Sequence, residues 1–322
     1  MNVFTTGQIR DIDNYTIKHE PVASIDLMER AAAACVNWLI NTFIRDTQFI
    51  IFAGPGNNGG DGWAIARLLA EKGYIHIRFF LLNISASLSA DSEVNRKRLI
   101  QQNIVPITLI NSTDDFPEIS EKDVVIDALF GSGLSRPLTG IAAALVKHIN
   151  AAHCKIVSVD IPSGLMGEDN SENDPEAIIR ANYTLSFQFP KIAFFFAENE
   201  DYTGKWFLLD IGLHSEAIEK MKTPYYYLEE NDIRKLIKPR KIFSHKGNYG
   251  HALLIAGSYG MMGAAVLASK ACLRSGAGLV SAHIPVRGYE IMQSSIPEAI
   301  ISIDLSEICF SKVPDLVPYN AI

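Results

Sequence analysis

The sequence predicts an α/β fold built on a largely parallel β-sheet with helices on both faces. Short apolar runs recur along the first two thirds of the chain and alternate with helical or loop segments. This alternation is typical of parallel strands joined by crossover helices. Polar segments that contain glycine follow three of these runs. We therefore expect a ligand site beyond the carboxyl ends of the strands.

The elements follow from apolar periodicity. Residues 7–45 are predicted to be helical, because Leu27, Ala31, Ala34 and Trp38 form an apolar stripe at helical spacing. Apolar runs then predict six strands, at 48–53, 75–82, 123–129, 155–159, 183–187 and 206–210.

A polar and basic segment, 239–248, separates a second unit from the first. This unit is predicted to contain a strand at 251–256, a helix at 264–275 and a strand at 279–284, and residues 320–322 resemble part of a further strand. We place the two domains at 1–225 and 226–322. We expect the second to be incomplete, because roughly 80 residues rarely close an α/β layer structure.

The composition is that of an ordinary globular protein, with 322 residues, 48% hydrophobic, 20% charged and a net charge of −7. No stripe of Lys and Arg is present, which argues against a nucleic-acid surface. The four cysteines are far apart and show no C-x-x-C spacing, so neither zinc nor a redox pair is indicated. No apolar stretch is long enough to span a membrane, and the N-terminus lacks a signal-peptide pattern. We expect a soluble cytoplasmic protein.

The segment 54–62 is predicted to be a loop between a buried strand and a helix that stops at Gly73. Gly54, Gly56 and Gly59 satisfy G-x-G-x-x-G, the dinucleotide-binding pattern. That pattern also needs an acidic residue at the end of the second strand, where this chain has Asn83. An ordinary tight turn is one alternative. A ligand loop is favoured by the polar residues Asn57, Asn58 and Asp61, which a plain turn does not require.

Three segments carry the site motifs. They read AGPGNNGGDG at 53–62, DALFGSGLSRPLTG at 127–140 and SVDIPSG at 158–164. With Phe189-Pro190-Lys191 and Asp210-Ile211-Gly212, they resemble the N-terminal YjeF-type domain, the NAD(P)H-hydrate epimerase, over roughly residues 5–215. The resemblance implies a Rossmann-like first domain. It also implies a homodimer or higher homo-oligomer.

The second unit is similar to the start of the ADP-dependent NAD(P)H-hydrate dehydratase, which has a ribokinase-like fold. The segments that carry this resemblance are 245–251, 256–258 and 274–280. Ala264 is a candidate wall of its substrate pocket. The later catalytic segments of that family do not occur before Ile322, so we expect no dehydratase activity from the chain as it stands. Mg²⁺ and ADP or ATP would serve only a complete dehydratase domain.

The resemblance assigns roles to individual residues. A hydrated NADH or NADPH would be bound by two segments and one further acid, namely Asn57, Asn58, Gly59, Gly60, Asp61, Gly131, Ser132, Gly133, Leu134, Ser135, Arg136, Pro137 and Asp160. A potassium ion would be held by Asn58, Asp127 and Ser163. Such oxygen ligands suit a hard cation, although magnesium or calcium would also accept them.

The implied reaction exchanges the R and S forms of the hydrate at C6 of the nicotinamide ring. It needs a proton donor and acceptor beside the C6 hydroxyl. We expect Asp160 to be the general acid or base, with Lys191 as the second choice. Two alternatives are a non-catalytic ligand-binding or assembly module of the same fold and a small-molecule kinase. The retained polar residues favour an enzyme, and the absence of a phosphate-transfer loop argues against a kinase.

Overall fold

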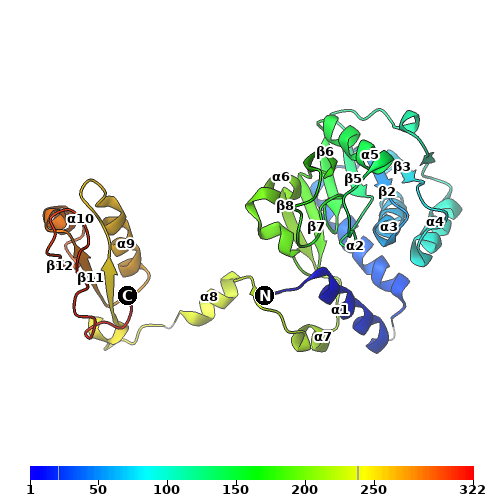
Figure 1. Ribbon diagram of the computed structural model, residues 1–322. Helices are drawn as coiled ribbons and strands as arrows, with labels where there is room; N and C mark the ends of the chain where they lie inside the picture. Colours follow the sequence, from blue (N-terminus) through cyan, green and yellow to red (C-terminus); the bar gives the residue numbers. More distant parts are fainter. Residues whose placement is uncertain (21, 238) are drawn as a thin grey trace. The chain divides into compact units, whose positions relative to one another are not determined.

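The computed structural model describes residues 1–20, 22–237 and 239–322. Its chain divides into two compact units, Met1–Glu229 and Glu230–Ile322, each with its own sheet. Figure 1 labels their helices and strands.

The first unit is built on a seven-stranded parallel sheet with the order β4-β3-β2-β5-β6-β7-β8. Its strands are β2 (Phe49–Ala53), β3 (Ile77–Leu82), β4 (Ile107–Ile110), β5 (Val124–Ala128), β6 (Lys155–Val159), β7 (Tyr183–Phe187) and β8 (Lys205–Leu209). The predicted α/β class and parallel sheet are thus confirmed. Strand β4 was not predicted, because its four residues form a short and partly exposed edge strand.

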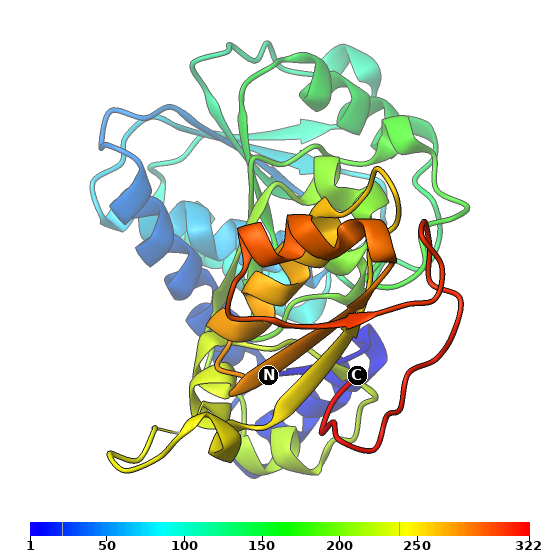
Figure 2. The ribbon, with the colours of Figure 1, turned by 90° about the vertical axis from the view of Figure 1, so that its left-hand side faces the viewer.

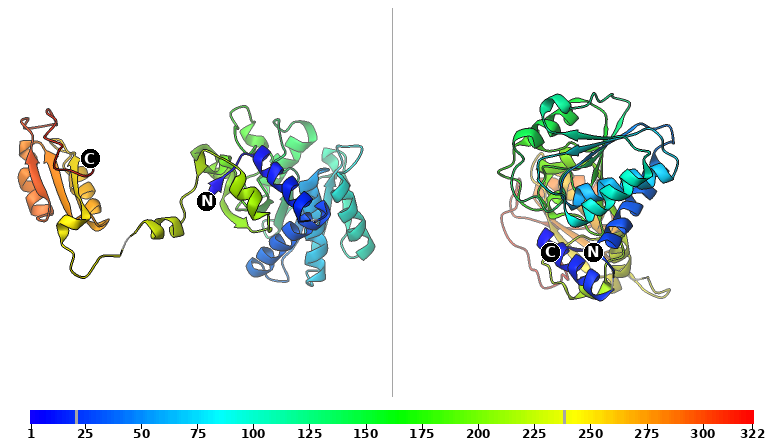
Figure 3. Two further views of the ribbon diagram at one scale, coloured as in Figure 1. Left: turned by 90° about the horizontal axis from the view of Figure 1, so that it is seen from below. Right: turned by 90° about the vertical axis from the view of Figure 1, so that its right-hand side faces the viewer.

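Helices cover both faces of this sheet (Figure 3). On one face lie α2 (Ser24–Thr42), α3 (Asn57–Glu71) and α4 (Ala90–Gln102), which share a core with Phe49, Ile51 and Phe79. On the other face lies α5 (Gly140–Ala151), which packs on the alternate residues Ile50 and Phe52. Each central strand is therefore apolar on both sides, as a doubly covered sheet requires.

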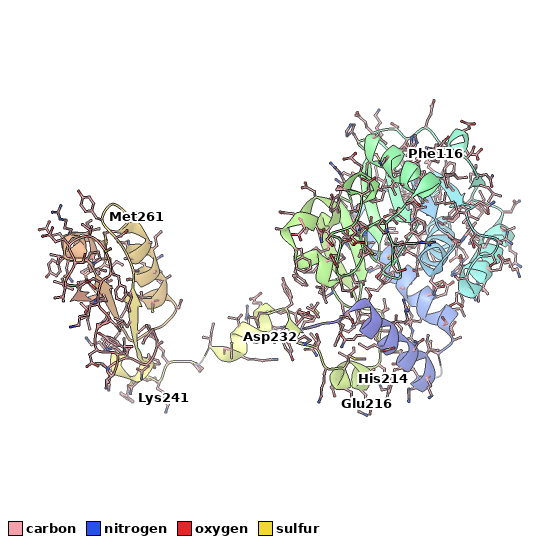
Figure 4. All side chains as sticks on the ribbon, in the orientation of Figure 1. Phe116, His214, Glu216, Asp232, Lys241 and Met261 are labelled. Carbon is pink, nitrogen blue, oxygen red and sulfur yellow. The ribbon has the colours of Figure 1, made fainter. Side chains whose placement is uncertain are left out.

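Helix α1 (Thr6–His19) packs away from the main sheet core. It shares an apolar cluster with α2, with the segments that follow β7 and β8, and with α7 (Ser215–Lys220). The Tyr15 hydroxyl donates to the Glu216 carboxylate at 3.1 Å, and the His214 amide donates to Thr16 Oγ1 at 3.0 Å. Figure 4 labels His214 and Glu216 at the start of α7. These contacts fix the position of α1.

The ends of the first unit are joined by a small antiparallel sheet. It pairs β1 (Asn2–Val3) with β9 (Tyr225–Tyr226). A short helix, α6 (Glu200–Thr203), precedes β8.

The second unit contains a three-stranded parallel sheet with the order β10-β11-β12 (Figure 2). Its elements are α8 (Glu230–Leu236), β10 (His251–Ile255), α9 (Gly263–Arg274), β11 (Leu279–Ile284), α10 (Tyr289–Ser295) and β12 (Ile300–Ile303). Helices α9 and α10 bury Met262, Ala265 and Met292 against Ala282 and Ile284 of β11. The strand expected at 320–322 is instead one isolated bridge, between Ala252 and Ala321.

Candidate functional site

A cavity of about 610 Å³ lies in the first unit and is lined by segments that follow five parallel strands. These segments come after β2, β5, β6, β7 and β8, so the carboxyl ends of the strands meet at this cavity. Helices α1 and α2 supply further lining residues. The location agrees with the rule that ligands of parallel α/β sheets bind at this edge.

The glycine-rich segment is mostly helix rather than loop, which corrects the prediction. Helix α3 begins at Asn57, so residues 57–62 form its first turns. A Cβ atom on Gly54 would lie 1.9 Å from the carbonyl oxygen of Leu129, and one on Gly59 would lie 1.8 Å from the carbonyl oxygen of Gly54. The glycines are therefore required by close packing of the β2–α3 turn against the end of β5.

The polar side chains of this segment are the ones that reach the cavity. Asn57, Asn58 and Asp61 line it, whereas Gly59 and Gly60 do not. A Cβ on Gly60 would lie 2.7 Å from the Met28 side chain, so this glycine also serves packing. No side chain caps the start of α3. Its free N–H groups can therefore bind an anionic group of a ligand.

The segment after β5 meets the other two at Gly131. A Cβ there would lie 3.1 Å from Asp160 Oδ2 and 3.2 Å from Asn58 Cβ, so the three segments predicted from the sequence converge at this point. Ser132 donates its backbone N–H to Asp160 Oδ2 at 2.9 Å. Residues 131–136 line the cavity, and Pro137 does not.

Asp160 directly follows β6 and faces the cavity in an unusual backbone conformation. Its φ is +68°, in the left-handed region that aspartate and asparagine enter more readily than most residues. Lys191 Nζ lies 2.7 Å from Asp160 Oδ1 and also donates to Ser186 Oγ at 3.1 Å. Burial raises the pKa of Asp160, but Lys191 and the Ser132 N–H outweigh burial and hold that pKa below its ordinary value. Asp160 is thus an ionised carboxylate paired with a buried lysine.

Asp127, by contrast, is closed off from the cavity. It is fully buried in β5 and accepts hydrogen bonds from Ser158 Oγ at 2.8 Å, Ser163 Oγ at 2.5 Å and the Ser163 backbone N–H at 2.9 Å. A longer bond comes from the Leu129 N–H, at 3.3 Å. Burial raises the pKa of Asp127, and the hydrogen bonds from Ser163 and Ser158 offset only part of that rise.

The predicted cation ligands fit a hard cation in their chemistry. Asn58 is 8% exposed, and neither polar atom of its side chain has a hydrogen-bond partner in the described part of the chain. Asp127 and Ser163 are already bonded to each other and supply a carboxylate and a hydroxyl. A buried amide without partners is costly unless a ligand satisfies it. Among residues 1–20, 22–237 and 239–322, no group of three His, Cys, Asp or Glu could hold a metal.

Two further carboxyl groups line the cavity, one of which sequence reasoning missed. Burial and the nearby charge of Asp160 raise the pKa of Asp13, on α1, to about 7, although Lys191 lowers it in part. Burial, followed by the charges of Asp160 and Asp13, raises the pKa of Asp61 well above its ordinary value. Asp13 lies four residues after the buried Ile9 and so falls on the apolar face of the predicted helix. An acidic residue on that face was the signal that could have identified Asp13 as a site residue.

Ala264 belongs to the second unit. It lies in α9, next to Gly263, and is exposed. Its role as a pocket wall stays a prediction.

Comparison with known proteins identifies relatives that match most of the chain. The family described as YjeF-related protein N-terminus matches residues 24–193. A bifunctional NAD(P)H-hydrate repair enzyme Nnr of Moorella thermoacetica is 32% identical over 314 residues, which cover 92% of this chain and 58% of that enzyme. A similar enzyme of Thermofilum pendens is covered to 57%, so the chain spans somewhat over half the length of these relatives.

Two other proteins are matched along nearly their whole length by part of this chain. An NAD(P)H-hydrate epimerase of Weissella koreensis is 33% identical over 213 residues, which cover 66% of this chain and 92% of that protein. The crystal structure of yeast ynu0 shares the fold, with a TM-score of 0.58 at 21% identity, over 72% of this chain and 98% of the yeast chain.

No helix in the described part of the chain is long and apolar enough to cross a membrane. The family match over residues 24–193 and the similarity to the Weissella protein along nearly its whole length agree with the motifs and the sheet. The chain belongs to the YjeF-related N-terminal family.

Proposed function

We propose that the first unit epimerises the R and S forms of NADH hydrate and NADPH hydrate. The observation that carries this proposal is the ion pair of Asp160 and the buried Lys191, at the end of β6, beside a cavity lined by Asn58 and Asp61. The similarity to the Weissella epimerase over 92% of its length supports the same reaction.

The site has the groups that this reaction needs. Inversion at C6 breaks and remakes the C–O bond on the other face of the ring, or opens and recloses the ring, and both routes need proton transfer at the hydroxyl. Asp160 is in the ionised form of a general base, and Lys191 orients its carboxylate. The N–H groups at the start of α3 would bind an anionic part of the dinucleotide. The substrate-binding roles of residues 57–61 and 131–137 belong to this proposal.

We propose a potassium ion between Asn58, which lines the cavity, and the buried residues Asp127 and Ser163 behind it. Asn58 Oδ1, the Asp127 carboxylate and Ser163 Oγ would hold it, and the unpartnered Asn58 amide is the observation that favours a bound cation. When bound, the ion supplies positive charge near a cavity lined by three aspartates.

We propose the second unit as the first part of an ADP-dependent NAD(P)H-hydrate dehydratase domain. The Moorella repair enzyme supports this, because its similarity extends over 92% of this chain. Ala264 would line the substrate pocket, and Mg²⁺ with ADP or ATP would act in a complete domain. We place the boundary between the two proposed domains after residue 225, and the compact units divide between Glu229 and Glu230.

The deciding experiment supplies the purified chain with a mixture of S and R NADPH hydrate and a separate dehydratase specific for the S form. Complete conversion to NADPH, faster than without the chain, is expected. Conversion that stalls at the S fraction, or that continues only at the spontaneous rate, would exclude the epimerase and favour a binding module. The Asp160→Asn variant provides the matched background rate.

A further inference from the structure

Asp13 is a carboxyl group of the cavity that the proposed function leaves without a role. It is contributed by α1, which is held by α7 and the segments after β7 and β8 rather than by the main sheet core. Asp160 reaches the same cavity from the end of β6. The two carboxyl groups therefore come from different walls of one cavity.

The Asp13 carboxyl is free to act on a ligand. In residues 1–20, 22–237 and 239–322 it makes no hydrogen bond and no ion pair, although the side chain is partly buried. Asp61 and Asn58, each 8% exposed, also line the cavity, and neither polar atom of the Asn58 side chain has a hydrogen-bond partner in the part of the chain that the structure describes. A polar group that is buried without a partner costs free energy, and a ligand that forms hydrogen bonds with it removes that cost.

We infer that Asp13 is the second proton-transfer residue of this site and that it acts as the general acid while Asp160 acts as the general base. This inference rests on the epimerase function proposed above. Inversion requires one protonated group and one ionised group, and the inference assigns the first role to Asp13 and the second to Asp160. Paired groups whose surroundings drive their protonation apart are the usual arrangement of an acid and a base.

The step balances without an oxidant or reductant. The C6–O bond breaks, its electron pair stays on oxygen, and the proton of Asp13 converts the departing hydroxyl to water. The ring nitrogen lone pair forms a C=N bond to C6. Water then adds to the other face of C6, Asp160 takes one of its protons, and the C=N pair returns to nitrogen. One proton has moved from Asp13 to Asp160, and its return through water restores both groups.

The charges around Asp13 favour these assignments. The charged or titratable side chains that line the cavity with it are Arg10, Asp61, Arg136, Asp160 and Lys191. Lys191 is paired with Asp160, so Asp160 remains ionised. Burial and the negative charge of Asp160 place the pKa of Asp13 at about 7, so that much of it carries a proton near neutral pH. Turnover should therefore fall as the pH rises through about 7 and Asp13 loses that proton.

The test compares Asp13→Asn with the wild-type chain by steady-state epimerisation across pH. We expect kcat to fall roughly 100-fold or more, the range of a lost general acid, while KM changes little. The fall of kcat above pH 7 should disappear from the residual rate. Asp13→Glu, which keeps a carboxyl, should recover part of the turnover. The control is Asp11→Asn on the same helix, which is exposed and does not line the cavity.

Each outcome separates this inference from the proposed function. An active wild-type chain together with an active Asp13→Asn variant overturns the inference alone. The inference is also overturned if the fall of kcat above pH 7 disappears in Asp61→Asn but persists in Asp13→Asn. That result would make Asp61, on α3, the general acid. A wild-type chain that does not epimerise removes the proposed function and the inference together. Thermal melting of Asp13→Asn establishes that lost turnover is not lost folding.

Discussion

The ends of β5 and β6 carry the same residue type in two different environments. Asp127 is fully buried and surrounded by donors from Ser158, Ser163 and Leu129, whereas Asp160 faces the cavity and pairs with Lys191. Neighbouring parallel strands thus deliver one carboxylate to the interior and one to the cavity. The position of a strand in the sheet thus brings an aspartate to this edge, while partners from neighbouring strands and loops, Ser158 and Ser163 for Asp127 and Lys191 for Asp160, set the surroundings of its carboxylate.

The largest expected effect comes from removing the charge that faces the cavity. Asp160→Asn should lower epimerase turnover roughly 1,000-fold, about 4 kcal/mol in the barrier, because the general base is lost. The fold should persist, since asparagine tolerates the positive φ and can still accept from the Ser132 N–H. Coupled dehydratase assays measure the turnover, and normal turnover in this variant would contradict the assignment.

The lysine left behind by this change supplies a control. Lys191 is 1% exposed, so Asp160→Asn leaves it buried beside a neutral amide. The double variant Asp160→Asn with Lys191→Met should therefore be more stable than the sum of the single changes, measured by urea unfolding. It should remain inactive. If the changes in the free energy of unfolding of the two single variants add up to that of the double variant, Asp160 and Lys191 do not stabilise each other in the folded protein.

At the end of β5, removal of the carboxylate of Asp127 is expected to lower stability rather than turnover. Asp127→Ala should lower the free energy of unfolding by roughly 3 kcal/mol, because the buried Ser163 and Leu129 N–H groups lose their acceptor. Asp127→Asn, which keeps one acceptor oxygen, should lose less. Urea unfolding measures both, and a fully stable Asp127→Ala variant would refute the structural role given to this carboxylate.

A smaller effect, with the opposite sign, is expected at α1. The pKa of Asp13 is about 7 in the folded chain against 3.8 for the free side chain, so the native state binds more protons between these values and stability falls as the pH rises through them. Asp13→Asn should thus be more stable than wild type at pH 8, by on the order of 2 kcal/mol. The advantage should vanish near pH 4. Thermal melting against pH checks this, and a variant less stable at pH 8 would contradict it.

The smallest effect concerns the cation. Potassium at ten times its Kd should stabilise the wild-type chain by about 1.4 kcal/mol relative to choline at equal ionic strength. Asn58→Leu removes the unpartnered amide, so it should be at least as stable as wild type without potassium and should not respond to the ion. Melting curves in the two salts separate these cases. An equal response of both chains would argue against Asn58 as a ligand.

The sheet was largely predictable from the sequence, because buried parallel strands are continuous apolar runs. Strands 155–159 and 183–187 were predicted to the residue. Strand β12 was not predicted, since four residues bounded by turns give a weak signal. The start of α3 was also missed, because glycine disfavours helix interiors. The close approach of Gly59 to the Gly54 carbonyl oxygen and of Gly60 to the Met28 side chain explains these glycines, and both contacts are with residues outside α3.

The site was predictable only where it is local in sequence. Segments 53–62, 127–140 and 158–164 could be predicted because each places glycine and polar residues directly after an apolar run. The parallel topology of the sheet brings them together. The pairing of Asp160 with Lys191 depends on the path of the chain after β7, and the arrival of Asp13 depends on how α1 docks. Such contacts join residues about 30 and about 150 positions apart, a distance over which periodicity and propensity carry no information.

The pairing of β1 with β9 places the beginning of the first unit beside its end. During synthesis α1 leaves the ribosome before the residues that hold it, because His214 and Glu216 follow about 200 residues later. The cavity is therefore completed late, after the sheet exists, and a nascent chain cannot bind its ligand early. The same closure makes this unit a good subject for circular permutation, with new ends cut in an exposed loop and the old ends joined across the β1–β9 pair.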